Sequence, residues 1–250
     1  MNILILGHRG MLGHMVNKFL STKNDCKIVT ISSRWPNQLF KDEIIEFCYH
    51  SSGDFIINCI GAIHQKTNNF DVNIELPIWL NDNIDSNLSN CKIIHPGTDC
   101  EMDNDNYGNS KRKAAEYILK NGCITKIIKT SIIGFEFNSK ASLLEWFLSN
   151  ENTVNGYTNV FWNGNTTLQW AKVCYEMMIN WKIYDKLSVI ATQKISKYDL
   201  LVIMKGVFKK DIEILKDSSL SVDKCLIKTL TMKNEDIKRQ LIEMKDFYSF

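Results

Sequence analysis

Short apolar runs rich in β-branched residues recur along the chain and alternate with longer segments of helical periodicity. The runs lie at 2–6, 27–31, 54–60, 91–95, 125–133 and 187–191. The first segment between them carries apolar residues at four-residue spacing, and these form one stripe of Met11, Leu12, Met15, Val16, Phe19 and Leu20. Strand-length runs that alternate with helices are typical of parallel strands joined by crossover helices. The pattern predicts an α/β fold with a Rossmann-like, doubly wound parallel sheet.

The last third of the chain departs from this alternation. Thr166 and Gln169 have the spacing of a capping box in front of the run LQWAKVCYEMM, which predicts a helix start. Toward the C-terminus the pattern predicts two helices, at 196–208 and roughly 233–246, around a short strand at 211–215. We expect a small C-terminal lobe, because this part is too short for an independent domain.

A glycine-rich loop follows the first strand. In GHRGMLG, Gly7, Gly10 and Gly13 separate a strand from an amphipathic helix. Glycine suits a loop that turns tightly, approaches a pyrophosphate closely and lets the helix pack on the strand, while the helix amides face the phosphates. We therefore predict a dinucleotide site, although three glycines alone are also compatible with a simple tight turn. The residues assigned to it from this loop are Gly7, Arg9, Gly10, Met11, Leu12 and Gly13.

The end of the second strand predicts which dinucleotide is preferred. An acidic residue there would bind the adenosine ribose of NAD, but the sequence reads ISSRW, which places Ser33 and Arg34 at this point. A guanidinium matches a 2′-phosphate, and Arg9 could approach the same group. This favours NADP(H) over NAD(H); the alternative for Arg34 is an ordinary solvated arginine.

The third strand ends in NCIGA, which is expected to leave room for the cofactor against the backbone. The residues assigned here are Cys59, Ile60, Gly61 and Ala62. Gly61 could equally be a turn glycine. Asn73, in DVNIELP, is expected to be an N-cap of the next helix.

A candidate catalytic group follows the strand CKIIH. Thr98 lies at the expected carboxyl edge of the sheet, where ligands bind in doubly wound folds. Tyr107 and Lys111 are four positions apart at a helix start, so both point from one face. A nearby ammonium is expected to lower the pKa of the phenol, and Thr98 could hold a carbonyl oxygen as it becomes an alkoxide. Carbonyl reduction needs these parts; a surface tyrosine and lysine is the alternative.

Composition narrows the classes of function. The 30 Lys and Arg residues against 28 Asp and Glu give a net charge of +2, and no run of like charge indicates a nucleic-acid or membrane partner. Apolar runs stay short of the ~18 residues of a membrane span, and the N-terminus lacks a basic region before its apolar run, so we expect a cytoplasmic protein. The eight cysteines and five histidines lack zinc-ligand spacing, and no metal site is expected.

These motifs resemble those of a known superfamily. GHRGMLG, NCIGAI, GTDC, YGNSK and KTSIIG stand in the order of the extended short-chain dehydrogenase/reductases. From residue 1 to about 180, the chain resembles the sugar-nucleotide reductase branch typified by dTDP-4-dehydrorhamnose reductase. GHRGM also resembles GDP-L-fucose synthase. The resemblance implies an NADP-dependent oxidoreductase of deoxysugar or polysaccharide precursor biosynthesis.

The resemblance also implies residue roles. Tyr107 would be the proton donor and Lys111 would bond the nicotinamide ribose, while Thr98 takes the place of the family's Ser/Thr. NADPH would deliver hydride to C4 of a nucleotide-linked 4-keto-6-deoxy sugar. The candidate substrate residues are Cys100, Trp162, Asn163 and Lys224. Trp162 could equally be a core residue. The expected NADP-binding Rossmann domain covers 1–140 and 165–192, and the expected substrate-binding lobe covers 141–164 and 193–250.

Two departures from the family keep other functions open. The loop between Thr98 and Tyr107 is short, although its nine residue steps can still span up to ~30 Å. This motivates a non-catalytic, NADP-binding regulatory subunit as one alternative. Cys100 matches a cysteine that epimerises C3 and C5 in GDP-L-fucose synthase, so a bifunctional 3,5-epimerase/4-reductase is another. No histidine follows His95 to partner Cys100, which favours a pure reductase with Cys100 packed in the pocket. The sequence leaves a homodimer open.

Overall fold

Six strands form one sheet in the first part of the structure. The computed structural model describes residues 1–49, 54–84, 91–122, 124–136 and 140–248. The strand order in the sheet is β2-β1-β3-β4-β5-β9. The strands are β1 (Asn2–Leu6), β2 (Lys27–Thr30), β3 (Phe55–Asn58), β4 (Lys92–Gly97), β5 (Thr125–Lys129) and β9 (Leu187–Val189). The pairs β1–β2, β1–β3, β3–β4 and β4–β5 are parallel, as the sequence predicts.

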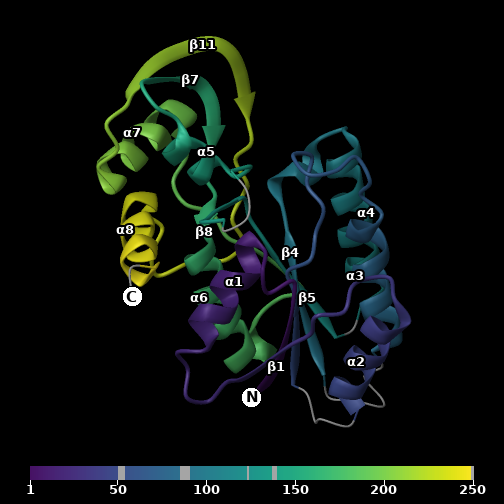
Figure 1. Cartoon of the computed structure of the whole chain (residues 1–250). Coiled ribbons are helices and arrows are strands. Elements are labelled where there is room, and N and C mark those ends of the chain that lie inside the picture. The colour runs from purple at the N-terminus through teal and green to yellow at the C-terminus, as the bar shows by residue number, and fades with distance from the viewer. Residues whose placement is uncertain (50–53, 85–90, 123, 137–139, 249–250) are drawn as a thin grey trace. The chain divides into compact units, whose positions relative to one another are not determined.

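Helices cover both faces of this sheet. They are α1 (Met11–Leu20), α2 (Gln38–Tyr49), α3 (Val72–Asn83), α4 (Asn106–Asn121) and α6 (Thr167–Ile179), with the short 3₁₀ helices η1 (Asp99–Met102) and η2 (Trp181–Ile183). Figure 1 shows α2, α3 and α4 along one face and α1 along the other. Apolar side chains of α2 and α3, among them Phe40, Ile44 and Leu80, pack on those of β1, β3 and β4. The predicted stripe of α1 is buried at Leu12, Met15, Val16, Phe19 and Leu20.

The strand order creates a switch point between β1 and β3. The chain leaves β1 for β2 on one side, and later returns to place β3 on the other side of β1. At such a point the loops after the two strands diverge, which opens a crevice at their carboxyl ends. The glycine loop follows β1 and the segment NCIGA follows β3, so the fold puts both at this crevice.

A second compact unit carries the rest of the chain. The first unit comprises Met1–Lys129 and Ala171–Ser188, and the second comprises Thr130–Trp170 and Val189–Phe250. The second unit holds a sheet of order β10-β7-β11 and a two-stranded pair β6–β8. Its elements are β6 (Ile132–Ile133), α5 (Leu143–Ser149), β7 (Thr153–Trp162), β8 (Asn165–Thr166), β10 (Ile195–Ser196), α7 (Lys197–Phe208), β11 (Glu213–Asp223) and α8 (Ile237–Tyr248).

Three local expectations are corrected here. The predicted strand 125–133 is divided into β5 and β6, because the chain passes into the second unit after Lys129. The predicted strand 211–215 is longer than expected and forms β11, which pairs in parallel with β7. No strand was predicted at β7. Among the described residues no helix is long and apolar enough to cross a membrane.

The predicted capping box at residue 166 forms only in half. The Gln169 amide donates to Thr166 Oγ1 at 3.2 Å, as expected. The Gln169 side chain does not reach back, since its Nε2 lies 3.8 Å from Met232 Sδ. The Thr166 amide instead donates to Gln240 Oε1 at 3.0 Å, and Gln240 also donates to Asn165. A buried glutamine from α8 thus takes the place of the expected reciprocal bond.

Candidate active site

The three glycines of the loop after β1 differ in whether the fold could accept a side chain at their positions. Gly7 has φ +75°, a left-handed conformation that favours glycine, and a Cβ there would lie 2.9 Å from Ile60. A Cβ at Gly13 would lie 2.2 Å from the carbonyl oxygen of Gly7, so α1 packs on the loop only without a side chain. At Gly10 a Cβ would meet the Gly7 oxygen at an ordinary 3.4 Å. The first and third glycines therefore serve the fold, while Gly10 leaves exposed backbone that a ligand can approach.

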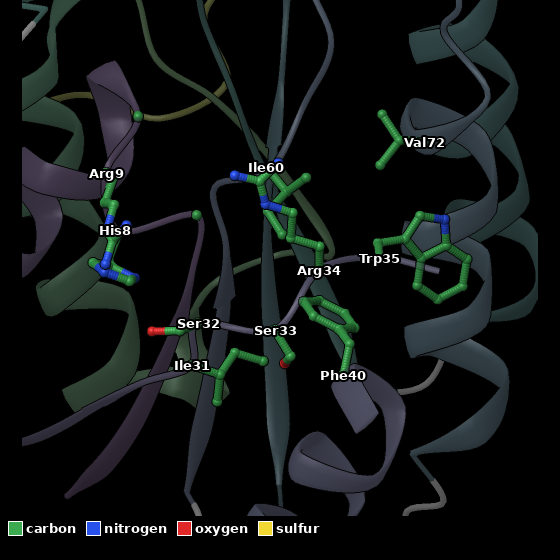
Figure 2. A pocket seen from close by; sticks show the side chains of 12 residues that line it. His8, Arg9, Ile31, Ser32, Ser33, Arg34, Trp35, Phe40, Ile60 and Val72 are labelled. Atoms are coloured by element: carbon green, nitrogen blue, oxygen red, sulfur yellow. The ribbon is translucent and has the colours of Figure 1, made fainter. Parts of the chain in front are cut away.

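A pocket of about 440 Å³ opens beside this loop. Its walls come from the glycine loop, the end of β2, and parts of α2, α3 and the loop after β3. Figure 2 shows His8 and Arg9 on one side of it and Trp35 and Val72 on the other. The lining residues are Gly7, His8, Arg9, Gly10, Ile31, Ser32, Ser33, Arg34, Trp35, Phe40, Ile60 and Val72. Of the predicted cofactor residues, the structure thus brings Gly7, Arg9, Gly10, Ser33, Arg34 and Ile60 together.

The Trp35 ring sits in an aromatic group at one side of this pocket. Its centroid lies 6.1 Å from the Phe40 ring and 5.7 Å from the Trp79 ring. Lys41 Nζ lies 5.1 Å above the Trp35 ring. The arrangement fixes an indole beside Arg34, which sequence reasoning did not assign, because a tryptophan after a strand has no distinctive spacing.

The loop after β3 is fixed by an asparagine from α3. The Asn73 side chain accepts from the Ala62 amide at 2.8 Å and donates to the Ala62 oxygen at 3.0 Å. It also donates to Ser110 Oγ of α4 at 3.1 Å. The expectation that Asn73 is an N-cap is wrong: Asp71 is the N-cap residue, and Asn73 is a fully buried clamp. It holds Gly61 and Ala62 in place beside the helix that carries Tyr107.

Thr98, Tyr107 and Lys111 gather at the carboxyl end of β4. Thr98 follows β4 directly, and Tyr107 and Lys111 project from the first turns of α4. The Tyr107 phenol is hydrogen-bonded to the Thr98 side chain. Lys111 is 6% exposed, and its Nζ donates to the Pro96 oxygen at 3.0 Å. Thr98 and Tyr107 are thus in contact, and Lys111 is bonded to the end of the same strand, while their role as one catalytic group stays a prediction.

The electrostatic expectation for Tyr107 is wrong. Burial raises the pKa of Tyr107, and nearby Cys100, Asp99 and Glu101 raise it further, while only the hydrogen bond with Thr98 lowers it. The Phe70 and His64 rings lie 5.8 and 5.3 Å from the Tyr107 ring and contribute to its burial. Mainly because it is buried, the phenol stays protonated at neutral pH. Protonated tyrosine is the form that a proton donor requires.

Burial acts on Lys111 in the opposite direction. It lowers the pKa of the Lys111 ammonium from 10.5 to about 8, against the opposing effect of Glu101. Below that pH the ammonium is charged, although it is almost wholly removed from solvent. Burial of a cation carries a free-energy cost, and buried cations with shifted pKa values are common at functional sites.

The short loop between Thr98 and Tyr107 is well anchored. Thr98 caps η1, with Glu101 Oε1 accepting from the Thr98 amide at 2.9 Å. Glu101 Oε2 pairs with Lys129 Nζ at 2.8 Å. A Cβ at Gly108 would lie 2.3 Å from the Cys100 oxygen, so the glycine of YGNSK lets α4 begin directly against η1. This is how eight intervening residues suffice to bring the two side chains together.

Cys100 and Asp99 border the same group. Asp99 is 7% exposed, and its Oδ1 accepts from Thr98 Oγ1 at 3.0 Å. The Cys100 thiol lies 3.8 Å from the same carboxylate oxygen and donates to it. The thiol proton is thus directed to a carboxylate of the protein. Asp99 was not assigned from the sequence, because an acidic residue in an acidic stretch has no distinguishing pattern.

The remaining substrate candidates lie in the second unit. Trp162 is 2% exposed, and a Cβ at Gly164 would overlap its ring, so the indole is packed in the core. The Asn163 amide donates to the Leu226 oxygen and accepts from the Leu226 amide, both at 2.9 Å. Both functions of the Asn163 side chain are thus used within the unit. Lys224 is partly exposed, and its backbone amide bonds to Phe161. Their predicted contact with substrate stays a prediction, and the geometry favours a structural role for Trp162 and Asn163.

Comparison with known proteins shows the fold. No protein-family profile matches the sequence, and no curated protein is significantly similar to it in sequence. Among solved structures, a dTDP-4-dehydrorhamnose reductase from Clostridium acetobutylicum is 17% identical, with a TM-score of 0.80 over 100% of both chains. A dTDP-glucose 4,6-dehydratase from Bacillus anthracis, in complex with NAD, is 13% identical, with a TM-score of 0.75 over 100% of this chain and 96% of that chain.

A third similar structure carries the other nicotinamide cofactor. A GDP-mannoheptose C4 reductase from Campylobacter jejuni, with NADP bound, is 14% identical, with a TM-score of 0.67 over 100% of this chain and 98% of that chain. The chain therefore has the fold of enzymes that act on nucleotide-linked sugars with a nicotinamide cofactor. The fold expected from the motifs is confirmed.

Proposed function

We propose that the chain is an NADPH-dependent oxidoreductase that reduces the C4 ketone of a nucleotide-activated 4-keto-6-deoxy sugar. The observation that carries the proposal is the hydrogen-bonded pair of Thr98 and Tyr107, with Lys111 on the same helix, at the carboxyl end of β4. The similar solved structures support it, because two of them are named as reductases of nucleotide-linked sugars.

The residues beside β1 and β2 fit a dinucleotide. The exposed backbone of Gly10 at the start of α1 would accept a pyrophosphate, since helix amides there have no side-chain cap. Arg34 and Arg9 line the pocket and would face a 2′-phosphate. Gly61 and Ala62 are held by Asn73 at the edge of the crevice, where they would flank the nicotinamide half. When bound, the cofactor supplies the hydride.

The side chains of the protein would supply the proton that the sugar oxygen takes up. Tyr107 is protonated at neutral pH, and it would donate its proton to the sugar oxygen as that oxygen gains charge. The hydrogen bond with Thr98 is the one effect that lowers the pKa of Tyr107. Because the Thr98 proton is donated to Asp99, the Thr98 oxygen accepts from the protonated phenol and orients it. Asp99 accepts from Thr98 and so fixes the direction of that hydroxyl. Lys111, charged below about pH 8, would bond the nicotinamide ribose.

The geometry disfavours added epimerisation. A cysteine base must give up its proton, but the Cys100 thiol donates to the buried Asp99 carboxylate. No histidine follows His95 in the sequence to act with it. We therefore place Cys100 in the wall of the site, where it packs beside Tyr107.

The decisive experiment follows NADPH oxidation by absorbance with a panel of UDP-, GDP-, dTDP- and CDP-linked 4-keto-6-deoxy sugars in deuterated buffer. Oxidation with one nucleotide series would establish the reductase, and product mass would reveal any extra ring deuterium. Extra deuterium that disappears in Cys100→Ala would instead establish the epimerase/reductase. Tight NADPH binding without turnover on any sugar of the panel would refute the proposed reaction and favour a regulatory subunit.

A further inference from the structure

In dinucleotide-binding folds an acidic residue often follows the second strand. Here no acidic residue stands there, but an acidic side chain from α2 bonds to that segment. Ser33 lies three residues after the end of β2 and lines the pocket. Its hydroxyl donates to Oε2 of Glu43, which lies ten residues further on, on α2. Glu43 is partly exposed. A carboxylate therefore stands at the place where one binds ribose hydroxyls in dinucleotide-binding folds.

Two cations face the same pocket from the other elements. Arg34 follows Ser33 directly, Arg9 comes from the glycine loop, and both side chains are exposed. Within the described ranges, neither guanidinium forms an ion pair with an acidic side chain. They are therefore available to an anion in the pocket. The pocket is thus lined by guanidinium groups that suit a 2′-phosphate. The Glu43 carboxylate, which suits a ribose diol, lies next to the pocket through its bond with Ser33.

We propose that Glu43 is a specificity-determining residue that opposes Arg34, so that the two together set the preference between NAD(H) and NADP(H). The inference rests on the proposed dinucleotide site and deepens it. Glu43 accepts from an adenosine ribose hydroxyl of NAD(H), which a carboxylate does well. The same carboxylate repels a 2′-phosphate, while Arg34 attracts it. Ser33, which lines the pocket, donates to the Glu43 carboxylate and so holds it next to the pocket.

The test measures nucleotide binding without any sugar substrate. Dissociation constants of NAD⁺ and NADP⁺ are determined by titration calorimetry for the wild type, Glu43→Gln and Glu46→Gln. Glutamine keeps an oxygen that accepts from Ser33 but loses the charge, so the fold is preserved. Glu46 lies on the same helix and is exposed, which makes it a matched control for charge removal.

In Glu43→Gln the ratio of the NAD⁺ to the NADP⁺ dissociation constant should rise by about tenfold, because repulsion of the phosphate is relieved and the ribose loses an acceptor. Arg34→Ala should shift the ratio in the opposite direction, and Glu46→Gln should leave it unchanged. An unchanged ratio in Glu43→Gln, or the same change in Glu46→Gln, would overturn the proposal. Arg34→Ala also supplies a readout if Glu43→Gln does not fold: an unchanged ratio there would overturn the opposition of the two residues.

Binding and turnover separate this proposal from the proposed reaction. A wild-type protein that binds nucleotide but reduces no keto sugar would refute the reaction and leave the role of Glu43 intact. A wild-type protein that binds neither nucleotide would refute both.

Discussion

The two ends of the candidate site in the first unit differ in how they are held. At the end proposed for catalysis, Lys111 and Asp99 are 6% and 7% exposed, and each is bonded within the protein. At the adenosine end, Arg9 and Arg34 are exposed and line an open pocket. Chemistry needs groups that are fixed before the reaction, because reorganisation would add to the barrier. Recognition of a phosphate needs accessible charge. Substitutions should therefore separate catalysis from binding.

The largest effect is expected from Tyr107→Phe. Loss of the proton donor should lower kcat by about 10²–10⁴-fold, while NADPH binding stays within about twofold of wild type. Turnover is measured by NADPH oxidation and binding by calorimetry. Tyr117→Phe is the matched control, because this tyrosine lies on the same helix and its hydroxyl contacts only the exposed Asp82 among the described residues. Near-normal turnover in Tyr107→Phe would remove it from the mechanism.

A second contrast lies between two glycines of one loop. Gly13→Ala should destabilise the protein by about 1–3 kcal/mol or more, because the added Cβ meets the Gly7 oxygen at 2.2 Å. Gly10→Ala should leave stability nearly unchanged, since its Cβ makes ordinary contact, but should weaken NADP⁺ binding by about tenfold through the approach to the pyrophosphate. Thermal unfolding and calorimetry distinguish the two. Equal destabilisation by both substitutions would show that Gly10 also serves the fold.

A further effect concerns pH, and it is small near neutral pH. Because burial sets the pKa of Lys111 at about 8, the charged form is lost as the pH rises through that value. The kcat/KM for NADPH should then fall by up to about tenfold per pH unit. Arginine stays charged over this range, so Lys111→Arg should lack this alkaline limb even if its rate is lower. A wild-type profile that stays flat to about pH 10 would argue against a catalytic charge at Lys111.

Much of the first unit could be predicted, because its signals are local. Each strand is a compact β-branched run, and the glycine loop and YGNSK lie directly beside the elements that they terminate or begin. The sheet of the second unit was missed at β7, where buried Val154, Val160 and Trp162 are separated by polar residues and glycine. β11 was underestimated for a similar reason, since most of its side chains are exposed. Strands of this kind form because they hydrogen-bond to a neighbouring strand, and their own sequences carry little strand signal.

Long-range pairings explain the other gaps. Glu43 reaches Ser33 from a helix, and Asn73 bridges the backbone of Ala62 and Ser110 of α4. The residues next to each partner in the sequence give no sign of either hydrogen bond. The prediction for the pKa of Tyr107 was wrong mainly because the sequence spacing does not show how deeply the phenol is buried, and because the acidic residues of η1 also raise its pKa. Sequence spacing places side chains on a face but does not rank their distances.

The strand order of the first unit also determines when neighbouring strands become available for pairing during synthesis. β5 ends at Lys129, but its neighbour in the sheet, β9, begins at Leu187. About 60 residues must be translated between them, which takes roughly 3–12 s at the usual 5–20 residues per second. During that interval β5 is the outermost strand of the growing sheet, with its amides and carbonyls unpaired on one side. The glycine loop, Thr98, Tyr107 and Lys111 are thus synthesised before β9, the strand that pairs with β5 at the edge of the sheet.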